Sequence, residues 1–429
     1  GCSLVGWCSL GTCISAPQGQ RFNQNSPYVG QNDTGFEAVQ ATADGGARVW
    51  TIRDANVFRT EFDAWAGQAS PEYMALCKGF TNVRHLEPRF DGSLLITGDA
   101  GTTTSPRARY CIIDAAGKPT TTNVVAMETG CSTCWSVARW SAEGLDGSTF
   151  IVGSWRKPAT SKFFAVVQKL APNQQKGWSM SFVDGESLGA HAVVAATDGG
   201  AFVVGRATTN GKSVGIVAAV THDGKQRFLT KVASGQDDLL QAATLMKSGT
   251  LLAAGSATLN AATTALFLVG LNPTTGKVLW KKVSQPSDLA IAVSAIAEPN
   301  GGAVITGNIT LFGQKRVFLD RIDDAGARVW RRTYLLSSSG LKGEARTLAT
   351  WDGGYLIGAR TFANGSSQST GDGPVLIKTD KGGFDGCAVA GGCVAKKPAD
   401  CDDKNACTAD WCHPTNGCQH HAVAGCTAK

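Results

Sequence analysis

The sequence predicts an all-β fold: a six- or seven-bladed β-propeller of four-stranded blades, with disulfide-rich extensions at both ends. Three observations predict it. An apolar signature recurs at intervals of about 50 residues, the segments around it alternate like strands, and most cysteines lie outside the repeats. Composition agrees, because 43% hydrophobic residues exclude a disordered chain, and 52 glycines suit a fold with many tight turns.

The signature consists of a turn containing Gly, a run of apolar residues and a second Gly. It reads DGSLLITG from Asp91, DGSTFIVG from Asp146, DGGAFVVG from Asp198, SGTLLAAG from Ser248, NGGAVITG from Asn300 and DGGYLIG from Asp352. Its unbroken apolar run is typical of a strand that is covered on both faces. The period is that of propeller blades and is longer than that of most helical repeats.

Each unit also contains three other strand-like segments. An apolar segment precedes the signature, and a third segment, such as that at 215–224, ends in Asp or Asn with Gly, which favours a tight hairpin turn. The fourth, KVLWKKV from Lys277 in one unit, alternates apolar and basic residues. Such alternation is expected of an outer edge strand with one solvated face.

The N-terminal segment from Phe36 shares the residues GARVW with the segment at 326–330. We therefore expect it to supply third- and fourth-type strands that complete the last blade and close the ring. Residues 47–53 should then pair in one sheet with residues 374–380 or lie in the adjacent blade. Six signatures give six blades, and seven result if residues 54–80 belong to a divergent blade.

Fourteen cysteines form three groups, which predicts disulfides and hence an extracellular or outer cell-surface location. The groups are Cys2, Cys8 and Cys13; Cys77, Cys111, Cys131 and Cys134; and Cys387, Cys393, Cys401, Cys407, Cys412, Cys418 and Cys426. Zinc is the alternative, but the one C-x2-C pair lies far along the chain from the C-terminal histidines.

The parity of the groups predicts a long-range bond. The middle group is even, and Cys77–Cys111 with Cys131–Cys134 is its favoured pairing. The outer groups are both odd, so at least one bond should join them if every cysteine is paired, and it would close nearly the whole chain into a loop. A lipid anchor at Cys2 is the less favoured alternative.

The domain organisation follows from these patterns. We expect a cysteine-containing N-terminal segment at 1–35, the propeller at 36–386 and a cysteine-rich module at 387–429. The uncharged stretch 248–276 is long enough to cross a membrane, but it aligns with two strands of other units. No transmembrane segment is therefore expected.

The repeats resemble a family of bacterial secreted propellers with units of the form DGGYxVxG followed by VxKLDxxGxxxWxKTY. The resemblance covers about residues 36–386 and implies a secreted propeller. The segment NPTTGKVLW at 272–280 is similar to a quinoprotein propeller repeat. A quinoprotein dehydrogenase would show that pattern in most units, and only one unit has it here, so this enzyme is not favoured.

Residues 401–421 read CDDKNACTADWCHPTNGCQHH. They resemble the CDDGNPCTxDxCxxxxGCxH repeat of extracellular matrix proteins of social amoebae and of large secreted bacterial proteins, departing at Lys404 and Ala406. The resemblance implies an extracellular spacer or adhesive module. Its oxygen-bearing side chains offer a weak Ca²⁺ site, but turn capping is the favoured role, so no cofactor is expected. These residues are Asp402, Asp403, Asn405 and Asp410.

The function predicted from these patterns is non-catalytic. No catalytic motif is present, and His85, His191 and His222 stand isolated, as satisfied structural histidines do. A net charge of +6 without a basic run excludes a nucleic-acid binder. We expect a secreted binding, adhesion or structural protein whose partner is another extracellular protein or a polysaccharide. The alternative is a carbohydrate-active hydrolase or lyase, whose scattered active-site residues a sequence does not assemble.

Overall fold

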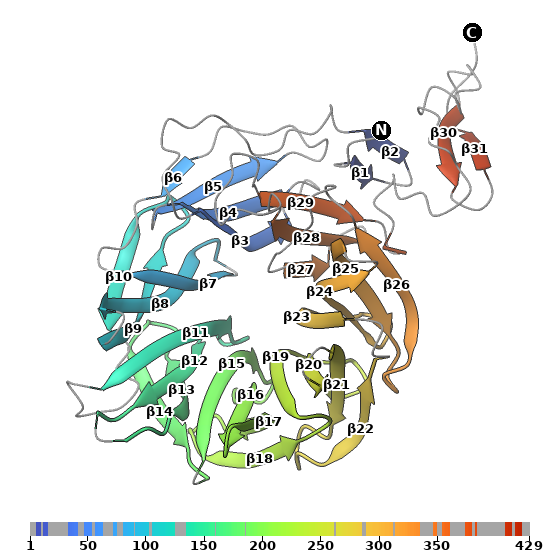
Figure 1. The fold of residues 1–429 in the computed structure, drawn as a ribbon. Coiled ribbons are helices and arrows are strands. Elements are labelled where there is room, and N and C mark those ends of the chain that lie inside the picture. The colour runs from blue at the N-terminus through green and yellow to red at the C-terminus, as the bar shows by residue number, and fades with distance from the viewer. Residues whose placement is uncertain are drawn as a thin grey trace.

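The structure is a computed structural model in which the chain is described over the following ranges: 6–9, 12–15, 33–41, 47–53, 56–62, 72–74, 80–89, 91–102, 105–124, 134–158, 160–184, 186–260, 263–284, 289–311, 314–334, 346–349, 354–360, 374–379, 382–383, 408–413 and 417–422. Within these ranges every regular element is a β-strand. Most of the strands are arranged around a common centre (Figure 1). The all-β, propeller-like fold is confirmed.

The described strands of the ring are grouped into seven successive units of antiparallel strands, in which spatial order follows chain order, and single bridging pairs join units 4 to 6 into one twelve-stranded sheet. Units 1 to 3 are β3 (Asp33–Ala41), β4 (Ala47–Arg53), β5 (Asn56–Phe62) and β6 (Glu72–Met74); β7 (Asn82–Pro88), β8 (Leu94–Thr102), β9 (Ser105–Ile113) and β10 (Pro119–Val124); and β11 (Trp135–Glu143), β12 (Thr149–Arg156), β13 (Phe164–Leu170) and β14 (Lys176–Phe182). The first strand of each unit is innermost in the ring (Figure 1).

Units 4 to 7 repeat the same order. They are β15 (Ser187–Ala195), β16 (Ala201–Thr209), β17 (Lys212–Val220) and β18 (Gln226–Val232); β19 (Asp237–Leu245), β20 (Leu251–Asn260), β21 (Thr263–Leu271) and β22 (Val278–Val283); β23 (Leu289–Ala297), β24 (Ala303–Leu311), β25 (Gln314–Ile322) and β26 (Arg328–Tyr334); and β27 (Arg346–Ala349), β28 (Tyr355–Arg360) and β29 (Pro374–Thr379). Every signature supplies a second strand, as predicted, and the five signatures from Asp91 to Asn300 also form the turn that leads into it.

The assignment of the N-terminal strands was wrong. Residues 33–41 and 47–53 are the first and second strands of their own unit, β3 and β4, and not third and fourth strands of the last one. The cause is that GARVW follows its own signature turn, DGG at 44–46. Trp50 is accordingly buried, whereas Trp330, on an outer strand, is half-buried. β3 still contacts β27 and β28, so the first and last units are neighbours, as expected.

A shared irregularity of the first strands explains the last glycine of the signature. In units 2 to 6 the pairing of the first with the second strand skips one residue, which is a β-bulge. The signature glycine lies opposite this bulge. A Cβ atom on Gly205 would lie 1.9 Å from the carbonyl oxygen of Gly189, and one on Gly307 would lie 1.9 Å from that of Ile291. Only glycine lets the two backbones approach so closely.

A second repeated contact joins the outer edges of neighbouring units. The Trp178 ring lies against Gly224 in the hairpin turn of the next unit, and its Nε1 donates a hydrogen bond to the His222 carbonyl oxygen at 2.8 Å. Trp280 does the same with Gly326 and the Asp324 carbonyl oxygen, at 3.1 Å. Phe228 against Gly276 and Trp330 against Gly383 complete the series. We call these four contacts the outer latches.

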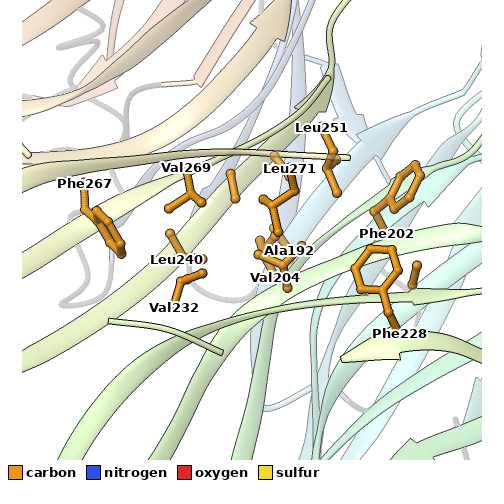
Figure 2. Close-up of a cluster of buried hydrophobic side chains, with 14 of the residues drawn as sticks. Ala192, Phe202, Val204, Phe228, Val232, Leu240, Leu251, Phe267, Val269 and Leu271 are labelled. Carbon is orange, nitrogen blue, oxygen red and sulfur yellow. The ribbon is translucent and has the colours of Figure 1, made fainter. Parts of the chain in front are cut away.

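Apolar side chains fill the space between units. Figure 2 shows the cluster between units 4 and 5, where Phe202 and Val204 of β16 approach Leu251 of β20. Full burial of one such side chain stabilises the fold by about 1.5–3 kcal/mol. Alternate residues of one signature strand belong to different clusters, Phe202 and Val204 to this one and Ala201 and Val203 to the one between units 3 and 4, so the prediction that these strands are covered on both faces is confirmed.

Two short hairpins lie outside the units. They are β1 (Gly6–Ser9) with β2 (Thr12–Ser15), and β30 (Thr408–His413) with β31 (Gly417–Ala422). The backbone register places Cys8 opposite Cys13 and Cys412 opposite Cys418. β2 contacts β30, and β1 contacts β29, so the two chain ends are close together, as expected (Figure 1).

The described residues include only some of the cysteines for which disulfides were predicted. Cys111 and Cys134 are disulfide-bonded. The other two members of the middle group, Cys77 and Cys131, lie outside the described residues, as do Cys2, Cys387, Cys393, Cys401, Cys407 and Cys426. Residues 248–276 form β20, β21 and two turns, and the described part of the chain contains no helix able to span a membrane.

Candidate functional site

In units 2 to 6, the bulge leaves one residue of the first strand without a paired residue on the second strand. A bulge changes the direction of such a side chain, and bulges are frequent next to active sites. We call these bulge residues the axial residues, since the first strands surround the centre of the ring (Figure 1). In units 2 to 6 they are Arg84, Arg139, His191, Gln241 and Val293. Each lies seven residues before the first residue of its signature, for example His191 before Asp198.

Three consecutive axial residues are basic, and they form one electrostatic cluster. Arg139 interacts with Arg84 and with Arg206, and His191 interacts with Arg139 and Arg206. Arg206 follows the signature glycine of unit 4 and is paired with Gly189 across the sheet. The cluster is held on three adjoining strands, because β11 contacts both β7 and β15.

Arg84 is the one member of the cluster with a carboxylate partner. Its Nε donates to Asp99 Oδ1, and the other oxygen of Asp99 accepts a hydrogen bond from Asn82 Nδ2 at 2.8 Å. Asp99 is buried and stands directly after the signature glycine of unit 2. The pair is thus a fixed, neutralised element at one side of the cluster.

Arg139 and Arg206 lack such a partner in the described part of the chain. The Nε of Arg139 is buried and has no hydrogen-bond partner there. Burial, followed by the charges of Arg84 and Arg206, lowers the pKa of Arg139 to about 10, so the group remains a cation at neutral pH. Asp99 offsets part of this repulsion, but the buried Nε remains unpaired, and a bound anion would supply its missing hydrogen-bond partner.

His191 is half-buried beside these cations. Burial, and then the charges of Arg139 and Arg206, lower its pKa from 6.5 to about 3. The imidazole is therefore neutral at physiological pH and can accept a proton. Perturbed titratable groups of this kind concentrate at functional sites. The sequence analysis expected an isolated structural histidine at this position, and the structure places His191 within the electrostatic influence of two cations.

The other two singled-out histidines have structural surroundings. His85 is buried, its Nδ1 lies 3.0 Å from Ser141 Oγ, and its ring stacks on Trp140 at 4.1 Å between centroids. It joins unit 2 to unit 3. His222 is exposed in a hairpin turn, where its carbonyl oxygen accepts the hydrogen bond of an outer latch from Trp178.

Carboxylates outside the cluster have structural roles, both in turns and on strands. Asp323 Oδ1 accepts hydrogen bonds from the amides of Ala325 and Ala327, and Asp320 is buried against Arg331. Of the weak Ca²⁺ candidates, Asp410 lies on β30, whereas Asp402, Asp403 and Asn405 are outside the described residues. No group of three possible metal ligands occurs among the described residues.

Chemically, the axial cluster can bind an anion and exchange a proton beside it. Two guanidinium groups without carboxylate partners can hold a carboxylate, with bidentate geometry available to each. A neutral imidazole next to them can act as a general base. The fixed spacing of seven residues before each signature is the sequence signal that would have found these residues.

A comparison with family models matches residues 400–423 to the Dictyostelium (slime mold) repeat. The match covers the C-terminal module that the sequence analysis identified by its cysteine spacing. It describes that segment and not the propeller units. No curated protein is similar enough in sequence to count as a relative of the whole chain.

Among solved structures, the chain is similar to the polysaccharide lyase Uly1, with a TM-score of 0.49, 12% identity and coverage of 80% of this chain and 90% of that one. An ulvan lyase of family PL25 gives 0.48, 10%, 82% and 96%. The quinohemoprotein alcohol dehydrogenase from Comamonas testosteroni gives 0.47, 10%, 86% and 78%. At these values the neighbours identify neither a substrate nor an active-site residue of this chain.

These comparisons correct the predicted function. The sequence favoured a non-catalytic binding or structural protein, whereas the three solved structures named above are of enzymes, two of them polysaccharide lyases. The findings agree better with the alternative, a carbohydrate-active hydrolase or lyase on a propeller. The prediction that the protein is not an enzyme is withdrawn for the same reason.

Proposed function

We propose that this protein is a polysaccharide lyase that cleaves a uronate-containing chain by β-elimination at the axial cluster. One observation carries the proposal: the charges of Arg139 and Arg206 act on the half-buried neutral imidazole of His191, and the buried Nε of Arg139 has no hydrogen-bond partner among the described residues. Elimination next to a carboxylate needs both functions, a cation for the carboxylate and a base for the proton on the adjacent carbon.

In this proposal the arginines bind the uronate carboxylate. Their charge stabilises the negative charge that develops as the α proton leaves, and stabilisation of this kind contributes about 10²–10³ in rate per group. Arg84, already neutralised by Asp99, positions the cluster from the side of unit 2. Its own role is orientation.

His191 takes the α proton, the electron pair forms the new carbon–carbon double bond, and the glycosidic bond to the leaving oxygen breaks. The imidazolium then returns the proton to that oxygen. Burial and then the arginines depress the pKa of His191, and the negative charge of the bound carboxylate assists the first step by offsetting the second of these causes. The base is therefore weak in the free protein and stronger once an acidic sugar is bound.

Hydrolysis is the less suitable reaction for this site. Glycoside hydrolases use two carboxyl groups on opposite sides of the bond. The one described carboxylate of the cluster, Asp99, is buried and engaged by both Arg84 and Asn82. It is not placed as a free acid or nucleophile.

The test is direct. The purified protein is incubated with polyglucuronate, a sulfated uronate polysaccharide or a neutral glucan, and ultraviolet absorbance reports the double bond formed by elimination. We expect absorbance to rise with one or both uronate polymers, not with the glucan, and to disappear in His191→Asn. New reducing ends without absorbance would show hydrolysis, and no cleavage of either uronate polymer would overturn the proposal.

We infer for the whole chain that the seven units are blades of one closed propeller at 36–386, flanked by the segment 1–35 and the module 387–429. The contacts of β3 with β27 and β28 support closure. The Dictyostelium-type repeat supports an extracellular location. The pairings Cys77–Cys111 and Cys131–Cys134, and one bond between the end groups, remain our predictions, and non-reducing peptide mapping tests them.

A further inference from the structure

Unit 3 carries, at the start of β11 and the end of β12, an aromatic and cationic group that the proposed reaction does not use. It consists of Trp135, Arg156 and Phe163, and we call it the shelf. The Trp135 and Phe163 rings meet edge to face with centroids 4.9 Å apart. The Arg156 guanidinium lies 5.1 Å from the Phe163 ring centroid. All three side chains are half-buried, so part of each faces solvent.

The backbone fixes the shelf against both strands that carry the cluster. Trp135 begins β11 and pairs with Arg156 at the end of β12. Phe163 is hydrogen-bonded to the start of β15 in both directions: its amide donates to Ser187 Oγ at 3.1 Å, and its carbonyl oxygen accepts from the amide of Leu188 at 2.8 Å. The shelf therefore spans from unit 3 to unit 4.

This placement sets the distance to the cluster. Trp135 precedes Arg139 by four residues on one strand, which corresponds to about 13 Å of extended chain. Leu188 precedes His191 by three residues, or about 10 Å. A short oligosaccharide lying along these strands from the axial cluster reaches the shelf.

The chemistry of the shelf matches the same kind of ligand. The Nε of Arg156 is buried without a hydrogen-bond partner, and no carboxylate among the described residues pairs with its guanidinium. Aromatic rings with a few well-placed polar groups are the usual lining of small-molecule sites. Arg156 covers one face of Phe163, so the exposed part of the Trp135 ring is the apolar surface for a sugar ring, and the guanidinium offers paired donors for a carboxylate or sulfate.

We propose that the shelf is a binding subsite for a second acidic sugar of the same polysaccharide, outside the residue that is cleaved. This inference rests on the proposed function for the identity of the ligand, but not for its evidence, since the shelf lies apart from the axial residues. The subsite makes the protein prefer long acidic chains over acidic disaccharides. It contributes binding and takes no part in proton transfer.

The experiment measures binding without turnover. In the His191→Asn background, calorimetry compares oligoglucuronates long enough to reach the shelf with the disaccharide. Arg156→Gln should weaken binding of the long oligomer about tenfold, the loss expected for one charge-assisted contact, and leave the disaccharide unchanged. Lys176→Gln, which removes an exposed cation on outer strand β14 of the same unit, is the matched control and should change neither.

A second readout separates the shelf from the cluster. In the otherwise wild-type protein, Arg156→Gln should raise KM for the long oligomer and leave kcat unchanged, as loss of uniform binding does. Trp135→Ala should act in the same direction, but Arg156→Gln is decisive because it leaves the rings in place. Unchanged affinity in Arg156→Gln overturns the subsite even if the protein is a lyase. Shelf-dependent binding without cleavage overturns the lyase and leaves the subsite standing.

Discussion

The inner and outer edges of the units repeat in opposite ways. At the inner edge the backbone is constant, since the bulge and its facing glycine recur in units 2 to 6, but the axial residue changes from Arg84 to Val293. At the outer edge the side chains are constant, since an aromatic ring rests on a glycine of the next unit four times over. Side chains that recur from unit to unit indicate a role in packing. A recurring backbone geometry that carries different side chains indicates a role in binding or catalysis.

The inner edge itself is divided. Units 2 to 4 supply the basic axial residues, whereas Gln241 and Val293 of units 5 and 6 are uncharged. Ile291, two residues before Val293, is among the exposed large hydrophobic residues. The bulge is the same on both sides, so the charge asymmetry comes from the side chains alone. Variants at matched bulges can therefore separate chemistry from architecture.

The largest expected effect is on catalysis at the basic side. His191→Asn should lower kcat on a uronate polymer by about a thousandfold, the typical contribution of a general base. Gln241→Asn, at the same bulge in the next unit, should leave kcat close to that of the wild type. Steady-state kinetics with thermal melting checks both. Equal losses in the two variants would show that the bulge, and not the imidazole, is what matters.

The next effect is on stability at the outer edge. Trp280→Ala removes a ring that rests on Gly326 and a hydrogen bond to the Asp324 carbonyl oxygen. We expect the free energy of unfolding to fall by about 3 kcal/mol, as for other large aromatic truncations. Denaturant unfolding measures it. Activity per folded molecule should be retained, and a fall in kcat would break the division between the edges.

Much of this architecture could be predicted from the sequence. The signature predicted the second strands, but the G-x3-W spacing does not mark the outer latches: it precedes Trp280 and Trp330, yet it also precedes Trp50 on second strand β4, and Trp178 follows Gln174 instead. The sequence does not predict that each latch ring contacts the hairpin-turn glycine of the next unit and not the turn of its own unit, because that contact depends on packing between units. The axial residues were missed because basic residues spaced about 50 apart look unrelated until the ring brings them together.

The third prediction concerns acid stability. The folded protein holds the pKa of His191 at about 3, through burial and then the charges of Arg139 and Arg206, whereas the ordinary value is 6.5. The unfolded chain therefore binds a proton there first, and stability present above pH 6.5 is lost as the pH falls towards 3. His191→Gln should remove this loss, which melting curves across that range would show as a gain over the wild type on acidification.

Arg139→Gln supplies the second arm of that test. Loss of this charge should raise the pKa of His191 and narrow the pH window in which stability is lost. Wild-type and His191→Gln curves that run parallel from pH 6.5 to 3 would contradict the depressed pKa.

The smallest effect concerns one exception at the outer edge. Gln174 occupies the turn position that Gly224, Gly276 and Gly326 hold in the next units, and it does so with a φ of 66°. Glycine is avoidable here because β10, the outer strand of the preceding unit, has the sequence PTTTNV and brings no aromatic ring. Glutamine can adopt the left-handed backbone conformation at a modest cost in free energy. It cannot replace glycine in a latch, where an aromatic ring of the preceding unit occupies the space of a side chain.

The two turns make a matched pair. Gln174→Gly relieves the left-handed strain but frees the unfolded chain, so it should raise stability by less than about 1 kcal/mol. Gly224→Gln imposes the same strain and also drives a side chain into Trp178, whose ring lies 2.7 Å from the Cβ position. It should cost several times more, because the ring has to leave its place on the neighbouring unit. Unfolding energies of similar size for the two variants would mean that the glycines serve the turn and not the latch.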